Sequence, residues 1–257
     1  YNFFITYANI DGWDFEKNDK QQSKNILDIW ILSRLHETIR TVTTSLEKYS
    51  AQKAALSIES FVNDLSLWYV RRSRDRIGPT AEDAEDKKAC YQTLHQVLTT
   101  LSTLLAPFTP FIAEEMYTNL TGEKSVHLVD FPVSDSTVIE KQLEKEMVAG
   151  RELVSVLLMK RKTTAVKVRI PLKKITYTGP EQVTSAVIKI VAEEANIQEL
   201  VWKGKSGEYT VTSSDKDFTD TDNRDMLLGE AREIVRMIQG ERKNIGTTLD
   251  EKVNVSL

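Results

Sequence analysis

Apolar residues recur at alternating intervals of three and four residues through much of the first 120 positions of this 257-residue chain. Such spacing lines the apolar side chains along one stripe of a helix, because one helical turn takes 3.6 residues. The first series predicts a helix from about residue 32 to residue 49. Its buried stripe consists of Leu32, Leu35, Ile39, Val42, Leu46 and Tyr49.

Two further series with the same spacing follow. One predicts a helix that runs on to about Arg76, and the next predicts a helix that ends before Pro107. Pro107 and Pro110 bend the chain into a shorter helix from Phe111 to about Leu120. Long helices with short connections predict an antiparallel bundle. The inward residues are Ala54, Ile58, Phe61, Leu65 and Trp68 in the second helix and Cys90, Leu94, Val97, Leu101 and Leu104 in the third.

The second half of the chain mixes helical and strand patterns. VHLVDFP at 126–132 predicts an extended crossing, and a fifth helix is predicted from about Val138 to Lys160. In AVKVRIP, apolar residues at 166, 168 and 170 alternate with basic ones, which predicts a half-buried strand. KKITYTG at 173–179 predicts a second strand segment.

The remaining elements complete a small α+β domain. Pro180 opens a predicted helix with Val183, Val187, Ile190 and Val191 inward. IQELVW and EYTVTS predict a hairpin around 203–207, a last helix is predicted from about Asn223 to Lys243, and VNVSL predicts a closing strand. The predicted fold class is α followed by α+β: an antiparallel helical bundle and then a small α+β domain.

Several classes of site are excluded by residue usage. The single cysteine, Cys90, excludes disulfides and cysteine-based zinc sites, and His36, His95 and His127 show no metal-ligand spacing. No phosphate-binding glycine loop, serine elbow or H-E-x-x-H motif is present. The uncharged stretch 89–113 is too polar and too interrupted by proline to span a membrane. We therefore expect neither catalytic residues nor metal in this chain.

The net charge of −4 conceals two different halves. Residues 1–150 sum to −6, whereas residues 151–257 sum to +2. Between Leu153 and Pro180 the chain has seven basic residues and no acidic one, which favours contact with a polyanion over a solvated strand face. The seven are Lys160, Arg161, Lys162, Lys167, Arg169, Lys173 and Lys174.

Two other basic clusters lie on predicted helices. Four arginines follow Trp68 and Tyr69 at a helix end, where they form either an ion-paired cap or a patch for a phosphate backbone. On the last helix, one side carries basic residues and the other is predicted core, formed by Leu227, Ala231, Ile234 and Ile238. The basic residues are Arg71, Arg72, Arg74 and Arg76 in the first cluster and Arg232, Arg236 and Lys243, with Gln239, in the second.

Segments along nearly the whole chain carry a family resemblance. They include FFITYANIDGWD, LDIWILSRLHETI, FVNDLSLWYVRRSRDR, LLAPFTPFIAEEMY and SVHLVDFP, followed by KVRIPL, EEANIQEL and GEAREIVRMIQGERKNIG. Together they resemble the C-terminal, anticodon-binding region of isoleucyl-tRNA synthetases, which are class I aminoacyl-tRNA synthetases. Similar bundles occur in the valyl, leucyl and methionyl enzymes, so the first five segments indicate only this subgroup, and the last three separate the isoleucyl family from the others.

The resemblance implies a domain organisation. Residues 1–20 would end the segment that links to a catalytic core, 21–136 would form the anticodon-binding bundle, and 137–257 would form a C-terminal helix plus a small tRNA-binding α+β domain. The opening YNFFITYANI lacks an initiator Met, so we expect a cut through a larger protein. The adenylate-forming HIGH and KMSKS motifs and the editing domain would lie upstream.

The resemblance also implies the function. The parent would be a cytoplasmic, monomeric enzyme of protein biosynthesis that uses ATP with Mg to attach isoleucine to its tRNA. This fragment would hold no cofactor, be inactive alone, and bind the anticodon arm and loop of isoleucine tRNA, not DNA or a membrane. Loop bases are read partly by stacking, so Trp68, Tyr69, Trp202 and Tyr209 are candidates, although its spacing places Trp68 in the core. The predicted tRNA-binding residues are Arg71, Arg72, Arg74, Arg76, Lys160, Arg161, Lys167, Arg169, Arg232, Arg236 and Lys243.

Two alternatives remain open from the sequence. The first is the equivalent region of a valyl- or leucyl-tRNA synthetase. The second is a non-catalytic helical scaffold for protein interactions, on which the basic clusters would be incidental.

Overall fold

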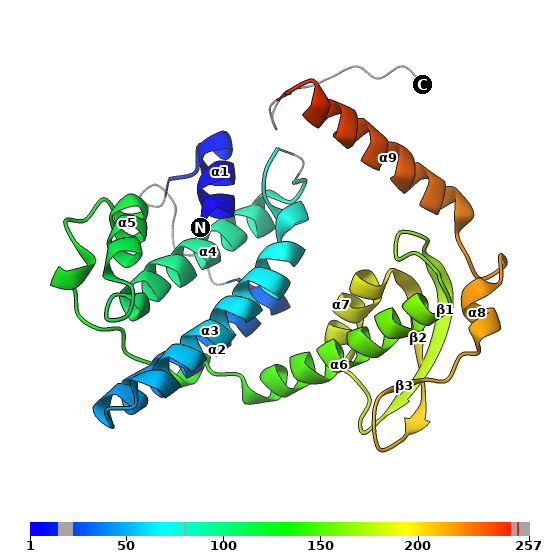
Figure 1. Ribbon diagram of the computed structural model, residues 1–257, viewed down its shortest axis with the longest axis horizontal. Helices are drawn as coiled ribbons and strands as arrows, with labels where there is room; N and C mark the ends of the chain where they lie inside the picture. The colour runs from blue at the N-terminus through cyan, green and yellow to red at the C-terminus, as the bar shows by residue number, and fades with distance from the viewer. Residues whose placement is uncertain (15–22, 80, 248–250, 252–257) are drawn as a thin grey trace. The chain divides into compact units, whose positions relative to one another are not determined.

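The computed structural model describes residues 1–14, 23–79, 81–247 and 251. The chain divides into two compact units, Tyr1–Lys141 and Gln142–Leu257, and each is described by itself. The first unit is helical, and the second combines helices with a three-stranded sheet (Figure 1). The predicted fold class, a helical bundle followed by a small α+β domain, is confirmed. No helix in the described ranges has the length and apolar character needed to cross a membrane.

The bundle is built from the predicted stripes. Its helices α2 and α3 lie side by side, joined by a short turn, and α4 and α5 form a second pair (Figure 1). Residues predicted to face inward are buried in all three long helices, including Leu35, Phe61 and Leu94. The helices are α1 (Asn2–Asp11), α2 (Ile26–Glu47), α3 (Ala51–Asp64), α4 (Ala84–Leu105) and α5 (Pro110–Thr121).

In the first stripe Leu32 and Leu46 are only half-buried, and Tyr49 at its end is fully exposed. It follows α2 in a left-handed conformation, with φ 56°, and its side chain is 98% exposed. The reason is the reversal of the chain into α3, where the Ser50 amide donates to the Ser45 carbonyl at 2.8 Å. Because Tyr49 lies beyond the helix in a left-handed conformation, its side chain does not follow the helical stripe of apolar residues. In the same way, 126–128 forms a 3₁₀ turn, η3 (Val126–Leu128), within the predicted extended crossing.

The second predicted helix does not continue regularly to Arg76. After α3 the chain winds as a π-helix, η1 (Leu65–Val70), and later as a 3₁₀ turn, η2 (Arg74–Arg76). The wider π turn rotates the following side chains relative to an α-helix. As a result Tyr69 is fully buried, whereas Trp68, which the spacing placed in the core, is only half-buried.

A buried charge network ties these helices together. Both terminal nitrogens of Arg76 donate to Asp28 at 2.7 Å, and Arg76 also donates twice to Asp86 at 2.7 and 2.8 Å. The Tyr69 hydroxyl donates to the same Asp28 at 2.5 Å. Burial alone would lower the pKa of Arg76, but the hydrogen bonds to both carboxylates raise it instead. One arginine thus joins α2, η2 and α4, and Asp28 adds η1.

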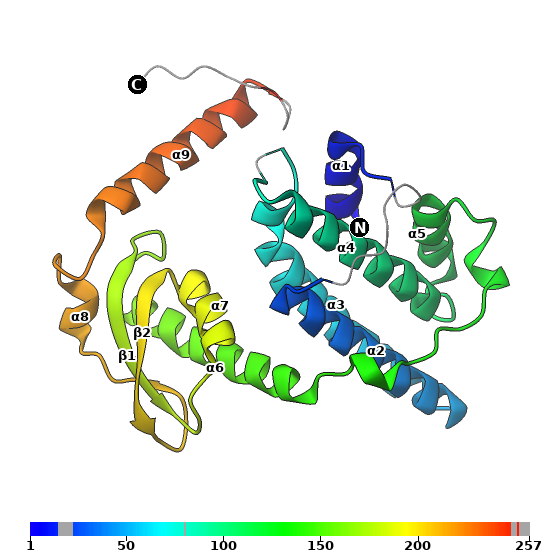
Figure 2. The same cartoon turned by 180° about the vertical axis from the view of Figure 1, so that it is seen from behind.

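The second unit is a β-α-β arrangement with a further strand. β1 (Leu172–Gly179) is central, β2 (Ile197–Lys205) runs parallel to it, and β3 (Thr210–Val211) pairs antiparallel on its other edge. The crossover from β1 to β2 is α7 (Ser185–Ala195), which packs on α6 (Lys141–Thr163) (Figure 2). Gly150 permits this contact, since a Cβ there would lie 2.6 Å from the Val187 side chain. The chain ends with α8 (Asp215–Thr219) and α9 (Met226–Asn244).

Several sequence predictions for this unit are wrong. Residues 197–202 and 208–213 do not form a hairpin, because the helical crossover places β2 parallel to β1 and leaves the antiparallel edge of β1 to β3. The segment 166–170 forms a turn instead of a strand, since its carbonyls accept hydrogen bonds from a buried arginine. The helix predicted to open at Pro180 begins at Ser185, although its inward residues are buried as predicted.

The apolar side of α9 is not a core. Leu227 is 82% exposed and Ile234 is 39% exposed, and Gly229 is the only buried residue in the helix. Gly229 lies against Ile170 and Pro171, so the first turn of α9 packs on the rest of the unit. The later turns of α9 bury no residue. The predicted closing strand VNVSL lies outside the described residues.

The charge network predicts a large stability effect. We expect Arg76→Ala to lower the free energy of unfolding of the bundle by about 3–5 kcal/mol, because it leaves Asp28 buried without its cation. Urea unfolding followed by circular dichroism measures this. Arg74→Ala, two residues away and exposed, is the matched control and should change stability by no more than about 0.5 kcal/mol. Equally small effects from both variants would contradict the structural role of Arg76.

Candidate nucleic-acid interface

The second unit is organised around a buried arginine near the C-terminal end of α6. Arg161 is 1% exposed. One terminal nitrogen donates to the carbonyls of Lys167 and Ile170 at 3.2 and 3.1 Å, and the other donates to the carbonyl of Asn196 at 2.8 Å. Arg161 therefore fixes the turn 166–171 and the end of α7 against the end of α6.

The setting of Arg161 differs from that of Arg76. Burial, and to a smaller extent the charge of Arg224, lower the pKa of Arg161 to about 10. Its hydrogen-bond acceptors in the described chain are main-chain carbonyls, and its Nε–H is buried without an acceptor there. Carbonyl oxygens carry only partial charge, so the burial of this cation is compensated less completely than that of Arg76.

The turn held by Arg161 brings basic residues together with α9. Arg169 donates to Glu233 at 2.7 Å, and Arg236 donates to the same carboxylate at 2.6 and 3.2 Å. The hydrogen bond from Arg236 is the main cause of the lowered pKa of Glu233, and the charges of Arg169 and Lys167 add to it. Three cations thus surround one carboxylate. We call this surface the basic patch; it comprises Lys167, Arg169, Arg232, Glu233 and Arg236.

Arg232 belongs to the patch through a different partner. Its Nη1 donates to the side-chain oxygen of Asn196 at 2.5 Å, and Asn196 ends α7. With one carboxylate and four cations, the patch carries an excess of positive charge on exposed or part-exposed side chains. Such a surface suits a phosphate backbone, which guanidinium groups contact with directed hydrogen bonds.

The other predicted residues of this unit lie apart from the patch. Lys160 forms an ion pair with Asp215 of α8 and is part-exposed. Lys243 is exposed in the last turn of α9, about two helical turns beyond Arg236. Arg161 is buried and holds the main chain, so we assign it a structural role and do not retain it as a phosphate contact.

The arginine cluster of the first unit divides in the same way. Arg71 and Arg74 are exposed, and Arg72 is half-buried. Arg76 has its donors directed at Asp28 and Asp86, so it too is assigned to the structure of the bundle. The ion-paired alternative weighed from the sequence therefore describes Arg76, while the side chains of Arg71 and Arg74 are exposed.

The aromatic candidates for base stacking also divide. Tyr69 is fully buried, and Tyr209 is 6% exposed with its hydroxyl bonded to the Glu181 carbonyl at 3.0 Å, so neither ring has a free face. Trp68 is half-buried. Trp202 is also half-buried and packs edge-on against Tyr177, with ring centroids 5.4 Å apart. Stacking on Trp68 and Trp202 stays a prediction.

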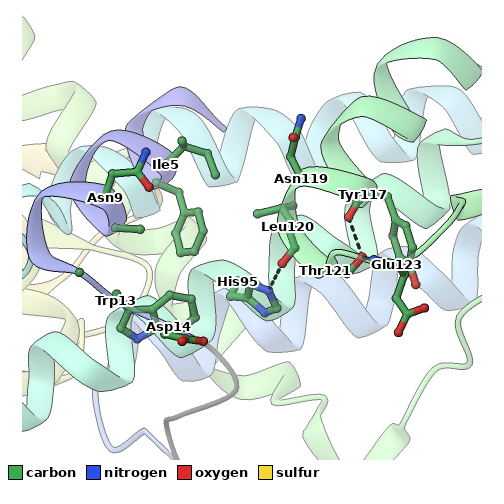
Figure 3. Close-up of a pocket in the computed structure, with 13 residues that line it drawn as sticks. Ile5, Asn9, Trp13, Asp14, His95, Tyr117, Asn119, Leu120, Thr121 and Glu123 are labelled. Atoms are coloured by element: carbon green, nitrogen blue, oxygen red, sulfur yellow. Dashed lines mark hydrogen bonds between the residues drawn. The ribbon is translucent and has the colours of Figure 1, made fainter.

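The first unit also contains an open cavity of about 790 Å³ between α1, α4 and α5 (Figure 3). Trp13 and His95 line its floor, with their rings 5.5 Å apart, and His95 Nε2 points at the Leu120 carbonyl at 2.9 Å. Asp14 and Glu123 are its acidic lining residues. Throughout the described ranges, no cluster of three histidine, cysteine or acidic residues is placed to hold a metal ion.

Comparison of the sequence with known proteins assigns the chain to a family. Residues 28–176, more than half of the chain, match the family model described as the anticodon-binding domain of tRNA ligase. The chain belongs to this anticodon-binding domain family. The matched range begins in α2 and ends within β1, so it includes Arg71 and Arg74 of the bundle and Lys167 and Arg169 of the patch.

Curated relatives of this anticodon-binding domain are isoleucine--tRNA ligases, which confirms the resemblance seen in the sequence. The ligase of Dehalococcoides mccartyi is 37% identical over 277 residues and is matched along 99% of this chain. Those of Bacillus thuringiensis and Clostridium tetani are 44% and 37% identical over 77% and 81% of the chain. The chain spans only 27%, 19% and 21% of the length of these three relatives.

Two important side chains of the interface were not predicted. Glu233 and Asn196 hold the exposed arginines, but in the sequence Glu233 is an ordinary helical acid and Asn196 an ordinary helix-ending residue. Glu233 lies 64 positions from Arg169, and Asn196 lies 36 positions from Arg232, so these two contacts carry no local signal; only the pairing of Glu233 with Arg236, three residues on, follows the helix period. Asp28 was missed for the same reason, since Arg76 lies 48 positions away.

Arg161 provides a test of how the patch is held. We expect Arg161→Met to destabilise the second unit by about 1–3 kcal/mol, because buried carbonyls lose their donor. Hydrogen exchange should accelerate at the Ile170 amide, whose N–H donates to the Lys167 carbonyl at 3.1 Å. Lys162→Met, at the exposed neighbouring position, is the control. Unchanged exchange in Arg161→Met would show that the turn forms without this cation.

Proposed function

We propose that this chain is the tRNA-recognition part of an isoleucine--tRNA ligase. The match to the anticodon-binding domain family carries the proposal, and the basic patch supplies a surface with the matching charge. The parent would use ATP with Mg to attach isoleucine to its tRNA in the cytoplasm. Its catalytic groups would lie outside this chain, which is proposed to be inactive alone.

The proposed division of work follows the two units. Arg71, Arg72 and Arg74 of the bundle would contact the backbone of the anticodon arm. Lys167, Arg169, Arg232 and Arg236, with Lys160 and Lys243, would contact the backbone near the anticodon loop. Sequence preference would come from contacts to unpaired loop bases, because backbone contacts alone carry no sequence information.

The proposed partner is isoleucine tRNA, bound by a monomer. The three isoleucine--tRNA ligases compared above match 77–99% of this chain, which is more than the range 28–176 matched by the family model, and this favours isoleucine over valine or leucine. A protein-interaction scaffold offers no reason for four cations to converge on the patch.

Binding of unmodified isoleucine and valine tRNAs across 50–300 mM salt tests the proposal. We expect tighter binding of isoleucine tRNA and a strong loss of affinity with salt. Lys167→Gln and Arg236→Gln should each reduce the slope of log affinity against log salt by about 0.7–0.9, the value for one phosphate contact. Filter binding or fluorescence anisotropy measures both quantities.

Three outcomes would count against this function. Equal, weak binding of both tRNAs would contradict isoleucine specificity. No binding at 50 mM salt would contradict tRNA recognition itself. Aminoacylation by this chain alone would contradict the proposal that the catalytic groups lie outside it. Arg40→Gln, an exposed cation of α2 paired with Glu37, is the matched control and should leave the salt slope unchanged.

A further inference from the structure

Asn196 occupies an unusual backbone position at the end of α7. Its φ of 52° and ψ of 57° are left-handed, and it is one of three non-glycine residues with positive φ among the described residues. Glycine adopts this conformation most easily, and asparagine adopts it better than most other residues. The backbone alone therefore does not explain why an asparagine stands here.

The side chain of Asn196 joins two elements. Its Nδ2 donates to the Val168 carbonyl at 2.7 Å, and its Oδ1 accepts from Arg232 Nη1 at 2.5 Å. Its main-chain carbonyl also accepts from Arg161 and from the Leu172 amide at 3.1 Å. Asn196 thus links the turn 166–171 and the rigid end of α7 to the first turns of α9.

The chemistry of this link differs from that of the rest of the basic patch. Arg169 and Arg236 both donate to Glu233, so a negative charge offsets part of their charge. The amide oxygen of Asn196 is neutral. It can orient the Arg232 guanidinium, which keeps its full charge and its remaining N–H donors.

We propose that Asn196 is a positioning residue that holds Arg232 in place for an RNA phosphate without neutralising it. This inference rests on the proposed function, because Arg232 is the group that contacts the RNA. A preoriented side chain loses less conformational entropy on binding than a free one, so the link raises affinity. An acidic residue at 196 would still accept from Arg232, but it would lose the donor to the Val168 carbonyl and would compete with the phosphate for the charge of Arg232.

Two substitutions separate orientation from charge. Asn196→Gly keeps the left-handed backbone and removes the link, so we expect affinity for isoleucine tRNA to fall about two- to tenfold with an unchanged salt slope. Asn196→Asp keeps an acceptor for Arg232 and adds a negative charge, so we expect the salt slope to fall by about 0.7–0.9. Circular dichroism and thermal unfolding verify that each variant is folded.

A double-mutant comparison shows whether the effect passes through Arg232. In the Arg232→Gln background, both substitutions at 196 should have effects on RNA binding that are much smaller than in the wild type. A merely structural role would instead change the melting temperature and leave the salt slopes of Asn196→Gly and Asn196→Asp alike. Asn119→Asp, an exposed amide of α5 with the same charge change, is the charge control.

The outcomes distinguish this inference from the proposed function. If the wild-type chain binds neither tRNA, the proposed function fails and the role of Asn196 in RNA binding fails with it. If the wild type binds but both 196 variants keep its affinity and salt slope, only the role of Asn196 is overturned. Effects at 196 that persist undiminished in Arg232→Gln also overturn it.

Discussion

The buried guanidinium of Arg161 is the interaction on which the second unit depends. It binds three main-chain carbonyls from two segments that lie far apart in sequence, the turn 166–171 and the end of α7. A cation buried with only partial negative charges around it is costly unless its hydrogen bonds are well formed. The segment around it therefore has little freedom to adopt another conformation. Because this segment is fixed, Arg169 and Asn196 are held where they contact Glu233 and Arg232 of α9, and the four side chains form one surface.

The sequence predicted most of the bundle but less of the second unit, for a physical reason. A buried stripe repeats every turn, so the spacing of residues such as Leu35, Phe61 and Leu94 from their near neighbours predicts each helix from local sequence. The π turn at 65–70 changes this period by one residue, and periodicity alone could not show that Tyr69 would replace Trp68 in the core. Strand order depends on which edge of β1 each partner reaches, and that is decided by the crossover helix instead of by the strands themselves.

The candidate interface shows the same division between local and distant information. The basic residues form clusters along the sequence, because charge is visible along the chain, but the basic patch combines members of two of these clusters and leaves other members out. The sequence could not tell Arg76 from Arg74 or Arg161 from Lys160, since the difference depends on tertiary contacts, among them those of Arg76 with Asp28, 48 positions away, and of Arg161 with the Asn196 carbonyl, 35 positions away. Arg76 meets Asp28 in the interior, whereas Arg74, two residues earlier, is exposed.

The partner of each arginine therefore decides what the arginine can do. The buried carboxylate of Asp28 and the part-exposed carboxylate of Asp86 make Arg76 a structural cation, and three carbonyls give Arg161 the role of holding the main chain. Exposed guanidiniums that share Glu233 are oriented but partly neutralised, which moderates the attraction of the patch for any polyanion. Arg232, oriented by a neutral amide, keeps the greatest share of its charge. A surface built in this way combines fixed geometry with moderate overall charge, so under the proposed function the patch would position the RNA backbone, and discrimination between RNAs would come from contacts elsewhere.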